Sequence, residues 1–441
     1  MNAKDKTIAL VSLGCDKNTV DSEKILFSIK NAGFNITSNL NDANIIILNT
    51  CAFILDAQQE SIDAILNAEQ YKKNGLCEKI LVCGCLVARN GKDLIKEIPN
   101  IDRLVGIDEY DKIPEIIFDL YDEKNFNICE LTTSGRILST PQHYAYVKIA
   151  DGCDNFCTYC TIPKIRGRFR SRTIEDIVNE CTKLVCDGVK ELIIVAQDVT
   201  RYGIDLYGEY KIVELVKKIN EIKGVKWIRL HYCYPELISD ELIDLVATND
   251  KVCKYFDIPL QHISDNVLKK MNRKSTFNTI CALIEKIKAQ KNKIAIRSSF
   301  IVGFPGETEN DFKELKNFII KYKLDNVGVF TYSREDGTPA FSMHNQVLSK
   351  IKKQRQKEIY QIQQEIVEMN NKKMIGQIFT AVCDEIADNK AILRNEYNSP
   401  GVDTLIICEV FDGIKQGQFY QVEITGYSNY DLVGNIKGEI L

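Results

Sequence analysis

Short apolar segments alternate with helical patterns through most of this 441-residue chain. Near-continuous apolar strands separated by helices are typical of a parallel sheet that is covered by helices on both faces. The alternation therefore predicts an α/β protein with a parallel-sheet domain at its N-terminus. In this first part we expect strands at Thr7–Leu13, Ala43–Leu48 and Ile80–Val82, and a helix from about Asp21 to Asn31.

A change of composition separates this domain from a second run of strands and helices. Thr132–Pro141 is rich in Thr, Ser, Gly and Pro, as linkers are, so we expect the first domain to span residues 1–135. Six strands follow, which are too few to close an eightfold barrel, and residues 143–373 are expected to form a partial (β/α)6 barrel. Its open side would admit a macromolecular substrate. The expected strands are Tyr144–Ile149, Glu191–Ala196, Lys226–Tyr232, Tyr255–Ile258, Ile294–Val302 and Val327–Tyr332.

The C-terminal part has a different pattern. A long charged helix is expected at about Ser349–Lys373, and short strands separated by turns then fill residues 374–441. Such spacing is typical of a small all-β barrel, a fold that often binds RNA. This segment holds four basic and ten acidic residues, a net charge of −6. An acidic module repels a phosphate backbone and attracts a basic protein, so a basic protein partner is expected rather than tRNA.

Cysteine usage and charge limit the class of protein. The chain contains 16 cysteines, carries a formal net charge of −4 and shows no secretory h-region after the opening MNAKDK. The cysteine spacings do not suggest a disulfide framework, so metal-binding thiols in a reduced, cytoplasmic compartment are expected. No apolar run is long enough to span a bilayer, and no membrane partner is expected. The small net charge is no general reason to expect nucleic acid.

Three cysteines lie close together in the loop after the strand Tyr144–Ile149. Cys153, Cys157 and Cys160 have the spacing C-x3-C-x2-C. Soft thiolates select iron–sulfur clusters over hard cations, so this loop predicts a [4Fe-4S] cluster with one iron left open for another ligand. A zinc site is the alternative. It would need a fourth protein ligand in a closed tetrahedron, and the nearest histidine, His143, is expected on the far side of the strand.

Three further cysteines, Cys15, Cys51 and Cys85, each follow the carboxyl end of an N-terminal strand. These ends line one crevice in an open parallel sheet, so the three thiols are expected to converge. Cys83 competes with Cys85, because side chains two residues apart on a strand share a face, but the loop position after Gly84 favours Cys85. Simple burial of free cysteines is the alternative. We accept burial for Cys77, Cys83, Cys129, Cys181, Cys186, Cys233, Cys253, Cys281, Cys383 and Cys408.

Polar or glycine-rich groups follow several barrel strands. A tight turn would by itself explain the Gly-Pro-Gly run at Gly303–Gly306, but glycines also let a backbone approach a ligand closely. On the same rim as the three-cysteine loop, a share in a cofactor site is favoured. His262 could equally be an ordinary rim histidine, and its role stays open. The rim residues assigned to this cofactor site are Gln197, Asp198, Arg297, Gly303 and Gly306.

Basic residues alternate with other residues directly after the three-cysteine loop. If this segment is extended, its cations would share one face and could bind a phosphate or a carboxylate. A solvated loop in which one or two arginines pair locally is the favoured interpretation. The residues are Lys164, Arg166, Arg168, Arg170 and Arg172.

With these residues in place, the chain resembles the radical S-adenosylmethionine (SAM) methylthiotransferases from end to end. Within that family, SLGCDKNTVDSE, DGCDNFCTYCTIP-x-IRG, AQD-x-T-RYG, IVGFPGET and YSREDGTPA are similar to the branch that modifies a ribosomal protein. The tRNA-modifying branch typically has Gly-Cys-Gln-Met-Asn where this chain has Asp16 and Lys17 after Gly14-Cys15. All six cysteines singled out above match the family pattern.

The resemblance implies a chemistry and a set of partners. A [4Fe-4S] cluster on Cys153, Cys157 and Cys160 would bind SAM and cleave it to a 5′-deoxyadenosyl radical, and Tyr159 would stack on the adenine. A second [4Fe-4S] cluster on the N-terminal cysteines would carry the sulfur. The methylthio group would be added to Cβ of an aspartate in a small-subunit ribosomal protein, with a reductant such as flavodoxin or ferredoxin. The C-terminal barrel would be a TRAM domain. The alternatives are a tRNA adenosine methylthiotransferase and a non-enzymatic iron–sulfur carrier.

Overall fold

The computed structural model describes residues 3–123 and 135–440. Compact packing divides the chain into two units. The first comprises Met1–Ser139 with Asp151–Asp154 and Cys160–Phe169. The second comprises Thr140–Ala150, Asn155–Tyr159 and Arg170–Leu441. None of the helices within the described ranges is long and apolar enough to cross a membrane.

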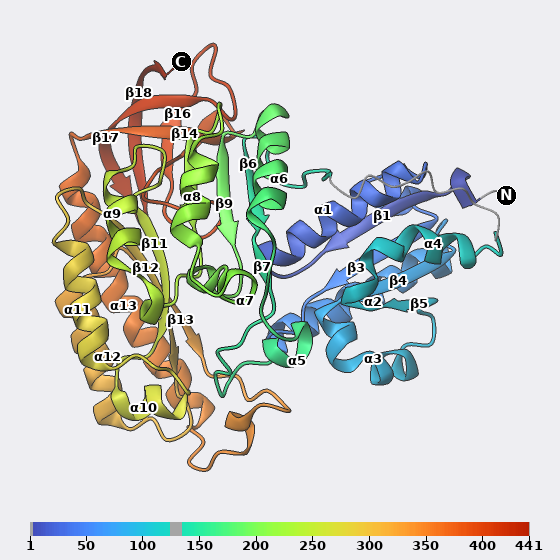
Figure 1. Ribbon diagram of the computed structural model, residues 1–441, viewed down its shortest axis with the longest axis horizontal. Coiled ribbons are helices and arrows are strands. Elements are labelled where there is room, and N and C mark those ends of the chain that lie inside the picture. The colour runs from blue at the N-terminus through green and yellow to red at the C-terminus, as the bar shows by residue number, and fades with distance from the viewer. Residues whose placement is uncertain (1–2, 124–134, 441) are drawn as a thin grey trace. The chain divides into compact units, whose positions relative to one another are not determined.

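The first unit is built on a five-stranded parallel sheet with the strand order β2-β1-β3-β4-β5 (Figure 1). β1 (Thr7–Ser12), β3 (Ile45–Thr50) and β4 (Lys79–Gly84) are the expected strands, and they are neighbours in the sheet. β3 and β4 each extend two residues beyond the expected end, because the polar ends of the two strands continue to pair in register. The edge strands β2 (Asn35–Ile36) and β5 (Arg103–Val105) are too short for an apolar pattern to reveal.

The first helix begins earlier than the sequence pattern indicates. α1 spans Asp16–Asn31, whereas the apolar period begins only near Asp21. Its first turns bury polar residues, among them Asn18 and Asp21, so no apolar repeat marks them. Asp16 in the first turn is favourably placed against the positive end of the helix dipole. These buried polar side chains lie at the same end of the sheet as Cys15.

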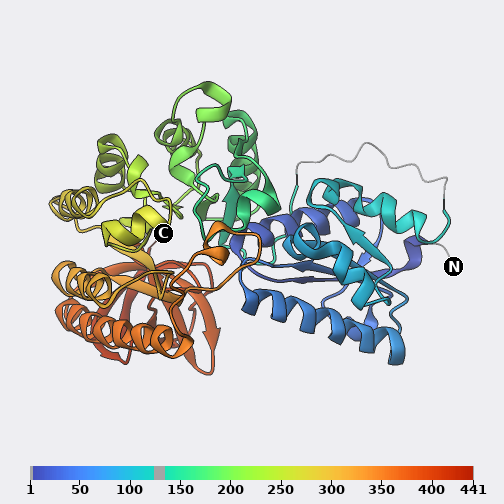
Figure 2. The ribbon, with the colours of Figure 1, turned by 90° about the horizontal axis from the view of Figure 1, so that it is seen from below.

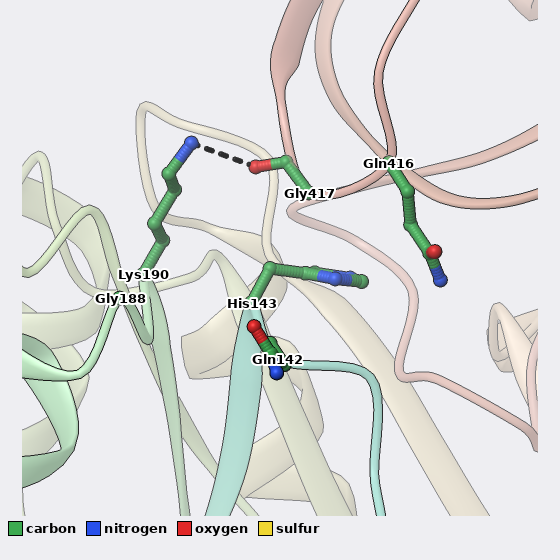
Figure 3. Close-up of a pocket in the computed structure, with 6 residues that line it drawn as sticks. All are labelled: Gln142, His143, Gly188, Lys190, Gln416 and Gly417. Atoms are coloured by element: carbon green, nitrogen blue, oxygen red, sulfur yellow. Dashed lines mark hydrogen bonds between the residues drawn. The ribbon is translucent and has the colours of Figure 1, made fainter.

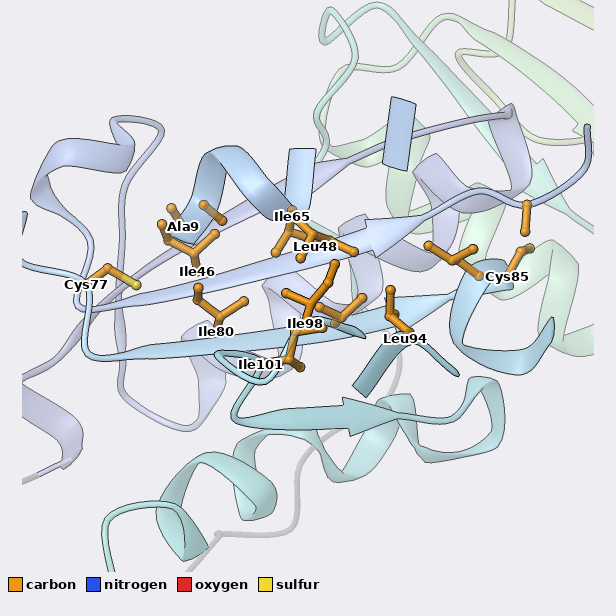
Figure 4. Close-up of a cluster of buried hydrophobic side chains, with 14 of the residues drawn as sticks. Ala9, Ile46, Leu48, Ile65, Cys77, Ile80, Cys85, Leu94, Ile98 and Ile101 are labelled. Atoms are coloured by element: carbon orange, nitrogen blue, oxygen red, sulfur yellow. The ribbon is translucent and has the colours of Figure 1, made fainter. Parts of the chain in front are cut away.

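Helices cover both faces of this sheet, because alternate residues of its strands point to opposite sides. Ile45 and Ile47 of β3 pack in a core with residues of α1 and of α4 (Ile113–Asp119). Ile46 and Leu48 pack on the other face in a second core with residues of α2 (Leu55–Asn74) and α3 (Cys85–Glu97), as Figure 4 shows. Full burial of each such side chain contributes about 1.5–3 kcal/mol, so the two cores hold the strand ends in place.

The second unit contains the six expected parallel strands, arranged as two three-stranded sheets of order β10-β9-β6 and β11-β12-β13. A single parallel bridge joins Ile228 of β10 to Val252, which lies shortly before β11 in the sequence. The partial barrel is therefore confirmed. Its strands are β6 (Tyr144–Lys148), β9 (Glu191–Val195), β10 (Trp227–Leu230), β11 (Tyr255–Gln261), β12 (Ala295–Val302) and β13 (Asn326–Thr331). Its principal helices are α6 (Ile174–Cys186), α8 (Ile212–Asn220), α9 (Asp240–Thr248), α11 (Phe277–Lys288) and α12 (Glu309–Tyr322).

The long charged helix and the C-terminal barrel are also present. α13 (Ser349–Met374) packs against β13 and β17, and Figure 2 shows it in orange beside the C-terminal strands. The five strands close into a barrel of order β14-β15-β16-β18-β17. Closure leaves no open sheet edge to pair with another chain. The strands are β14 (Ile378–Ala387), β15 (Lys390–Asn395), β16 (Ile406–Glu409), β17 (Phe419–Ser428) and β18 (Asp431–Ile440).

A buried chain of charges links the C-terminal barrel to the amino ends of the parallel strands. Glu191, at the start of β9, accepts hydrogen bonds from Arg229 Nε (2.8 Å) and from an Arg394 terminal nitrogen (2.6 Å). Arg394 also donates from Nε to Asp384 (2.8 Å), which in turn contacts His143 Nε2 (2.8 Å). Arg229, Glu191 and Arg394 are at most 1% exposed. A network of this kind is costly to break, because each partner removed leaves a buried charge unpaired.

A cavity of about 340 Å³ adjoins this network (Figure 3). His143 and Lys190, just before β6 and β9, line it together with Gln416 and Gly417 of the C-terminal barrel. Lys190 Nζ donates to the carbonyl oxygen of Gly417 (2.8 Å) and to Gln418 Oε1 (2.8 Å). The cavity therefore lies at the amino ends of the strands, and its cation is already satisfied within the protein.

Candidate metal centres

The three N-terminal cysteines follow three adjacent strands. Cys15 comes after β1 and caps α1, Cys51 directly follows β3, and Cys85 is the first residue of α3 after β4. The structure brings them together. Burial raises the pKa of Cys51, and the neighbouring Cys15 adds to that rise. Burial also raises the pKa of Cys85 to about 11, although Arg166 acts to lower it. Both Cys15 and Cys51 add to the rise. We call Cys15, Cys51 and Cys85 the auxiliary site.

Cys83 is separated from Cys85 by the backbone of Gly84. Gly84 has a φ of +95°, which breaks the strand before α3. The regular alternation that would place Cys83 and Cys85 on one face therefore does not apply. Cys83 is fully buried in the core between the sheet and α1, whereas Cys85 packs in the core of the opposite face. Simple burial accounts for Cys83.

The close approach of the strands requires glycine at two positions. A Cβ atom at Gly14, whose φ is +93°, would lie 2.7 Å from Cys51 Cβ. A Cβ atom at Gly84 would overlap the carbonyl oxygen of Thr50. Both glycines thus allow neighbouring cysteine loops to approach more closely than any other residue would permit.

We expect Gly84→Ala to destabilise the first unit by more than about 2 kcal/mol, because a left-handed backbone costs ~1–2 kcal/mol for alanine and the overlap adds to that cost. The shift in the thermal unfolding midpoint measures the effect. Gly188→Ala is the matched control, since Gly188 has a φ of +104° but no described atom within 4 Å of its Cβ position. Equal shifts for the two variants would contradict the close approach at Gly84.

A residue absent from the sequence-based site assignment, Asn18, connects the auxiliary cysteine loops. Its Nδ2 donates to the carbonyl oxygens of Leu13 (2.9 Å) and Thr50 (3.0 Å), which precede the Cys15 and Cys51 loops. Cys85 Sγ lies 3.9 Å from Asn18 Oδ1. Asn18 is 1% exposed. The only signal for it in the sequence is a polar residue three positions after Cys15 at the start of a helix.

The C-x3-C-x2-C loop contributes to both compact units. Cys153 and Cys160 lie in segments of the first unit, and Cys157 lies in a segment of the second. Cys157 Sγ is 3.8 Å from the hydroxyl oxygen of Tyr234. The Arg273 guanidinium lies over the Tyr234 ring, 4.2 Å from its centroid, and its side chain is 1% exposed. Tyr234 and Arg273 carry no motif that sequence reasoning could have used.

Gln197 and Asp198 follow β9 as expected, but they have different surroundings. Asp198 is fully buried and accepts hydrogen bonds from Thr200 Oγ1 (2.6 Å) and from Asn155 Nδ2 (3.0 Å) of the cysteine loop. Burial raises the pKa of Asp198. Gln197 Oε1 is buried and has no hydrogen-bond partner among the described residues. Asp198 thus orients the cysteine loop, while Gln197 has an acceptor available for a ligand.

The glycine-rich turn after β12 folds around Glu307. The Glu307 carboxylate accepts hydrogen bonds from the backbone N–H groups of Gly303 and Phe304, and burial raises the pKa of Glu307 to about 7. Gly303 and Gly306 each have a φ of +74°, so the tight turn alone requires glycine there. Tyr159 packs edge-to-face on Phe304, with ring centroids 6.5 Å apart, which places this tyrosine beside the turn.

Arg297 does not lie at a carboxyl strand end, and that placement was wrong. It is the third residue of β12, and its guanidinium forms an ion pair with Asp403 of the C-terminal barrel (2.7 Å). The Arg297 Nε atom also lies 3.8 Å from Asp257 Oδ1. A strand has two ends, and the residue pattern alone does not show which partners reach each of them. Arg297 therefore joins two parts of the second unit.

The remaining rim groups are held locally. His262 is fully buried, its Nδ1 accepts from the Ser264 backbone N–H (3.0 Å), and burial lowers its pKa to about 3. Of the basic run, Arg168 pairs with Asp154 (2.8 Å), Arg172 pairs with Asp176 and Glu180, and Arg166 is described below. Local pairing therefore holds for Arg168 and Arg172, whereas Arg166 pairs with residues of α1 that are far away in the sequence.

The chemistry of the donor sets fits iron–sulfur clusters. Within the described ranges, no group of three or more His, Cys, Asp or Glu side chains is arranged around a single metal ion. A cubane places a different iron beneath each thiolate, so its ligand sulfurs stand farther apart than those around one ion. The auxiliary site supplies three thiols without histidine or carboxylate, and the loop supplies a second set of three.

Comparison with known families matches three successive segments of the chain. Residues 7–106 match uncharacterized protein family UPF0004, residues 147–319 match the radical SAM superfamily, and residues 375–436 match the TRAM domain. Among solved structures, the radical SAM methyltransferase TsrM from Kitasatospora setae has a TM-score of 0.56 at 13% identity and covers 76% of this chain and 77% of its own. The cobalamin-dependent radical enzyme OxsB has a TM-score of 0.52 at 13% identity, covering 82% of this chain and 56% of its own. These two likenesses concern the fold alone.

Curated relatives match the chain over nearly its full length. Proteins named ribosomal protein uS12 methylthiotransferase RimO are 47% identical over 439 residues in Clostridium kluyveri and 46% identical over 436 residues in Clostridium tetani, covering 98% of both chains in each case. The protein of that name in Acetivibrio thermocellus is 44% identical over 449 residues, covering 98% of this chain and 99% of its own. Fold, donor sets and relatives together define a radical SAM methylthiotransferase, a transferase that inserts sulfur. Within that class, the chain belongs to the RimO family.

Proposed function

We propose that this enzyme adds a methylthio group to Cβ of an aspartate in the small-subunit ribosomal protein uS12, the protein that its relatives' names specify. The observation that carries the proposal is the end-to-end similarity to those relatives, which includes the N-terminal unit with its three converging thiols. Inserting sulfur at an unactivated C–H bond requires a radical cofactor, because amino-acid side chains cannot supply that chemistry.

Two [4Fe-4S] clusters would have different functions in this reaction. Cys153, Cys157 and Cys160 would hold the cluster that binds SAM, and the auxiliary site would hold the cluster that supplies sulfur. Bound SAM supplies the radical that removes hydrogen from the target carbon. The chain's own residues position these groups. The free Gln197 Oε1 would accept from SAM, Tyr159 would pack on its adenine, and Asp198 would orient the cysteine loop through Asn155.

In this proposal the N-terminal domain spans residues 1–135, the radical SAM domain spans 143–373 and the C-terminal TRAM domain spans 374–441. A cytoplasmic location and a reductant protein such as flavodoxin or ferredoxin belong to the same proposal. Both follow from the chemistry, because a reduced cluster needs an electron source and a compartment in which thiols stay reduced.

The surface of the C-terminal barrel supports a basic protein partner less strongly than its sequence does. Asp384 and Asp403 are used in internal ion pairs with Arg394 and Arg297, so they add nothing to the surface charge. Exposed acidic residues still outnumber exposed basic ones, five to three. They are Glu385, Asp388, Glu409, Asp412 and Glu439 against Lys390, Lys415 and Lys437.

The test combines anaerobically reconstituted enzyme, SAM and a reductant with purified small ribosomal subunits, and in parallel with bulk tRNA. Mass spectrometry then looks for a methylthio addition on each substrate. Addition to an aspartate of uS12 is the expected result. Addition to tRNA alone would overturn uS12 as the substrate while leaving the proposed chemistry intact. Cleavage of SAM without modification of either substrate would overturn both uS12 and tRNA as substrates.

A further inference from the structure

Arg166 follows the C-x3-C-x2-C loop in the sequence and contacts residues beside the auxiliary site. It is the last residue of α5 (Ile162–Arg166), six residues after Cys160, and its side chain is 2% exposed. One terminal nitrogen donates to Asn18 Oδ1 (2.6 Å). The other donates to Asp21 Oδ2 (3.0 Å) and to Asp151 Oδ2 (3.0 Å). All of these residues belong to the first compact unit.

Asn18 links Arg166 to the cysteine loops of the auxiliary site. Its Nδ2 group holds the backbone before Cys15 and the backbone before Cys51, while its Oδ1 accepts from Arg166 and lies 3.9 Å from Cys85 Sγ. Asn49 Nδ2 donates to the Asn18 carbonyl oxygen (3.1 Å), which ties α1 to β3 as well. A planar amide with both hydrogen-bonding ends engaged is fixed in one orientation. The Arg166–Asn18 pair therefore joins all three cysteine loops.

The charges around Arg166 distinguish it from a simple ion pair. Two carboxylates, the buried Asp21 and the partly buried Asp151, already balance one guanidinium and leave a net negative charge. Cys85 adds a third group that becomes anionic when it binds a metal, because the thiolate is the ligand form. Arg166 is thus a cation that offsets negative charge beside Cys85. Charge and hydrogen bonds near cluster sulfurs set the reduction potential of an iron–sulfur cluster.

We propose that Arg166 and Asn18 are positioning residues of the auxiliary site: Asn18 holds the three cysteine loops in register, and Arg166 orients Asn18 and raises the reduction potential of the cluster that these loops bind. This inference rests on the proposed function, because it requires a cluster at the auxiliary site. It also makes the segment after Cys160 a structural part of that site.

The experiment uses the full-length chain carrying Cys153→Ala, Cys157→Ala and Cys160→Ala, so that only the auxiliary site can bind a cluster. After anaerobic reconstitution, iron content and the midpoint potential from an EPR-monitored redox titration are measured. About four iron atoms per chain are expected in this background. Absence of iron there would overturn the second cluster of the proposed function, and with it this inference, before any Arg166 variant is compared.

Arg166→Gln in this background should lower the midpoint potential, since it removes the cation but keeps a donor for Asn18. Arg166→Lys should restore part of the potential while losing iron, because an ammonium carries the charge but cannot span Asn18 and both carboxylates. Asn18→Ala should lose at least half of the iron. An unchanged potential in Arg166→Gln at full iron occupancy would overturn the role of Arg166.

Arg136→Gln is the matched control. Arg136 is also 2% exposed in its side chain, belongs to the same unit and pairs with Glu23 of the same helix α1. Its iron content and midpoint potential should equal those of the background. Should Arg166→Gln fail to fold, Arg166→Lys is compared with the Arg136 control instead. Reduced iron content with a midpoint potential close to that of the control supports both roles of Arg166, whereas full iron content with a clearly lowered potential overturns them.

Discussion

The Cys51→Ala variant is expected to cleave SAM but to form no methylthiolated product. Cys51 lies in the first unit, directly after β3, and it is one of the three thiols of the auxiliary site. Alanine would remove a ligand of the proposed auxiliary cluster, and Cys83 could not replace it, because Cys83 is buried in the core between the sheet and α1. The loop Cys153, Cys157 and Cys160 keeps its ligands, so SAM cleavage continues. Product loss should exceed 10²-fold in a mass-spectrometric assay, comparable to the loss of a metal ligand's supporting contacts.

A second cysteine variant controls for the loss of a buried sulfur. Cys77→Ala removes a thiol that is 4% exposed and packs in the same core as Cys85, but lies at the opposite end of the sheet, just before β4. It should retain both SAM cleavage and product formation. Full product formation by Cys51→Ala would show that the auxiliary site is not needed for the reaction.

Arg394→Met is expected to cause a large loss of stability in the second unit. Arg394 is fully buried and pairs with Glu191 and Asp384, and methionine would leave both carboxylates without their shared cation. Removing one partner of a buried ion pair typically costs about 3–5 kcal/mol. The unfolding midpoint of the full-length protein in urea measures the change. Lys390→Met, which breaks an exposed pair with Glu409, is the control and should cost under about 1 kcal/mol.

The same network makes the stability of the second unit depend on pH. Burial acts to raise the pKa of Glu191, but Arg394 and Arg229 outweigh it and the pKa is lowered from its ordinary value of 4.5. Asp384 is likewise lowered from 3.8, through Arg394 and His143. The unfolded chain then binds protons more readily, so stability is complete above about pH 4.5 and falls as the pH drops below it. Arg394→Met should flatten this dependence, and an acid titration of the unfolding midpoint with an unchanged slope would contradict the network.

Much of the architecture could be predicted because it depends on local patterns. The strands β1, β3 and β4 and the six strands of the partial barrel are apolar runs, and burial of those runs is the largest favourable contribution to folding. The cysteines at the ends of β1, β3 and β4 could be assigned to one edge, because parallel strands place their carboxyl ends together. The C-terminal barrel followed from short strands of regular spacing.

Other features depend on contacts between residues far apart in the chain. Arg297 was assigned to the cofactor rim, yet its partner Asp403 lies more than 100 residues away in the C-terminal barrel. The early start of α1 was missed because its first turns bury polar residues that interact with Asn49, Thr50 and Arg166. Cys83 and Cys85 could not be separated without the backbone conformation of Gly84.

The sequence by itself determined the fold class, the two groups of thiols and the family, since each depends on short motifs and on the period of apolar residues. Only the tertiary structure decided which polar side chains serve those thiols. Asn18 and Arg166 are 148 residues apart in the sequence and 2.6 Å apart in space. Hydrogen bonds and ion pairs act over a few ångströms and carry no periodic signal, so the residues that position a site emerge only when the chain is folded.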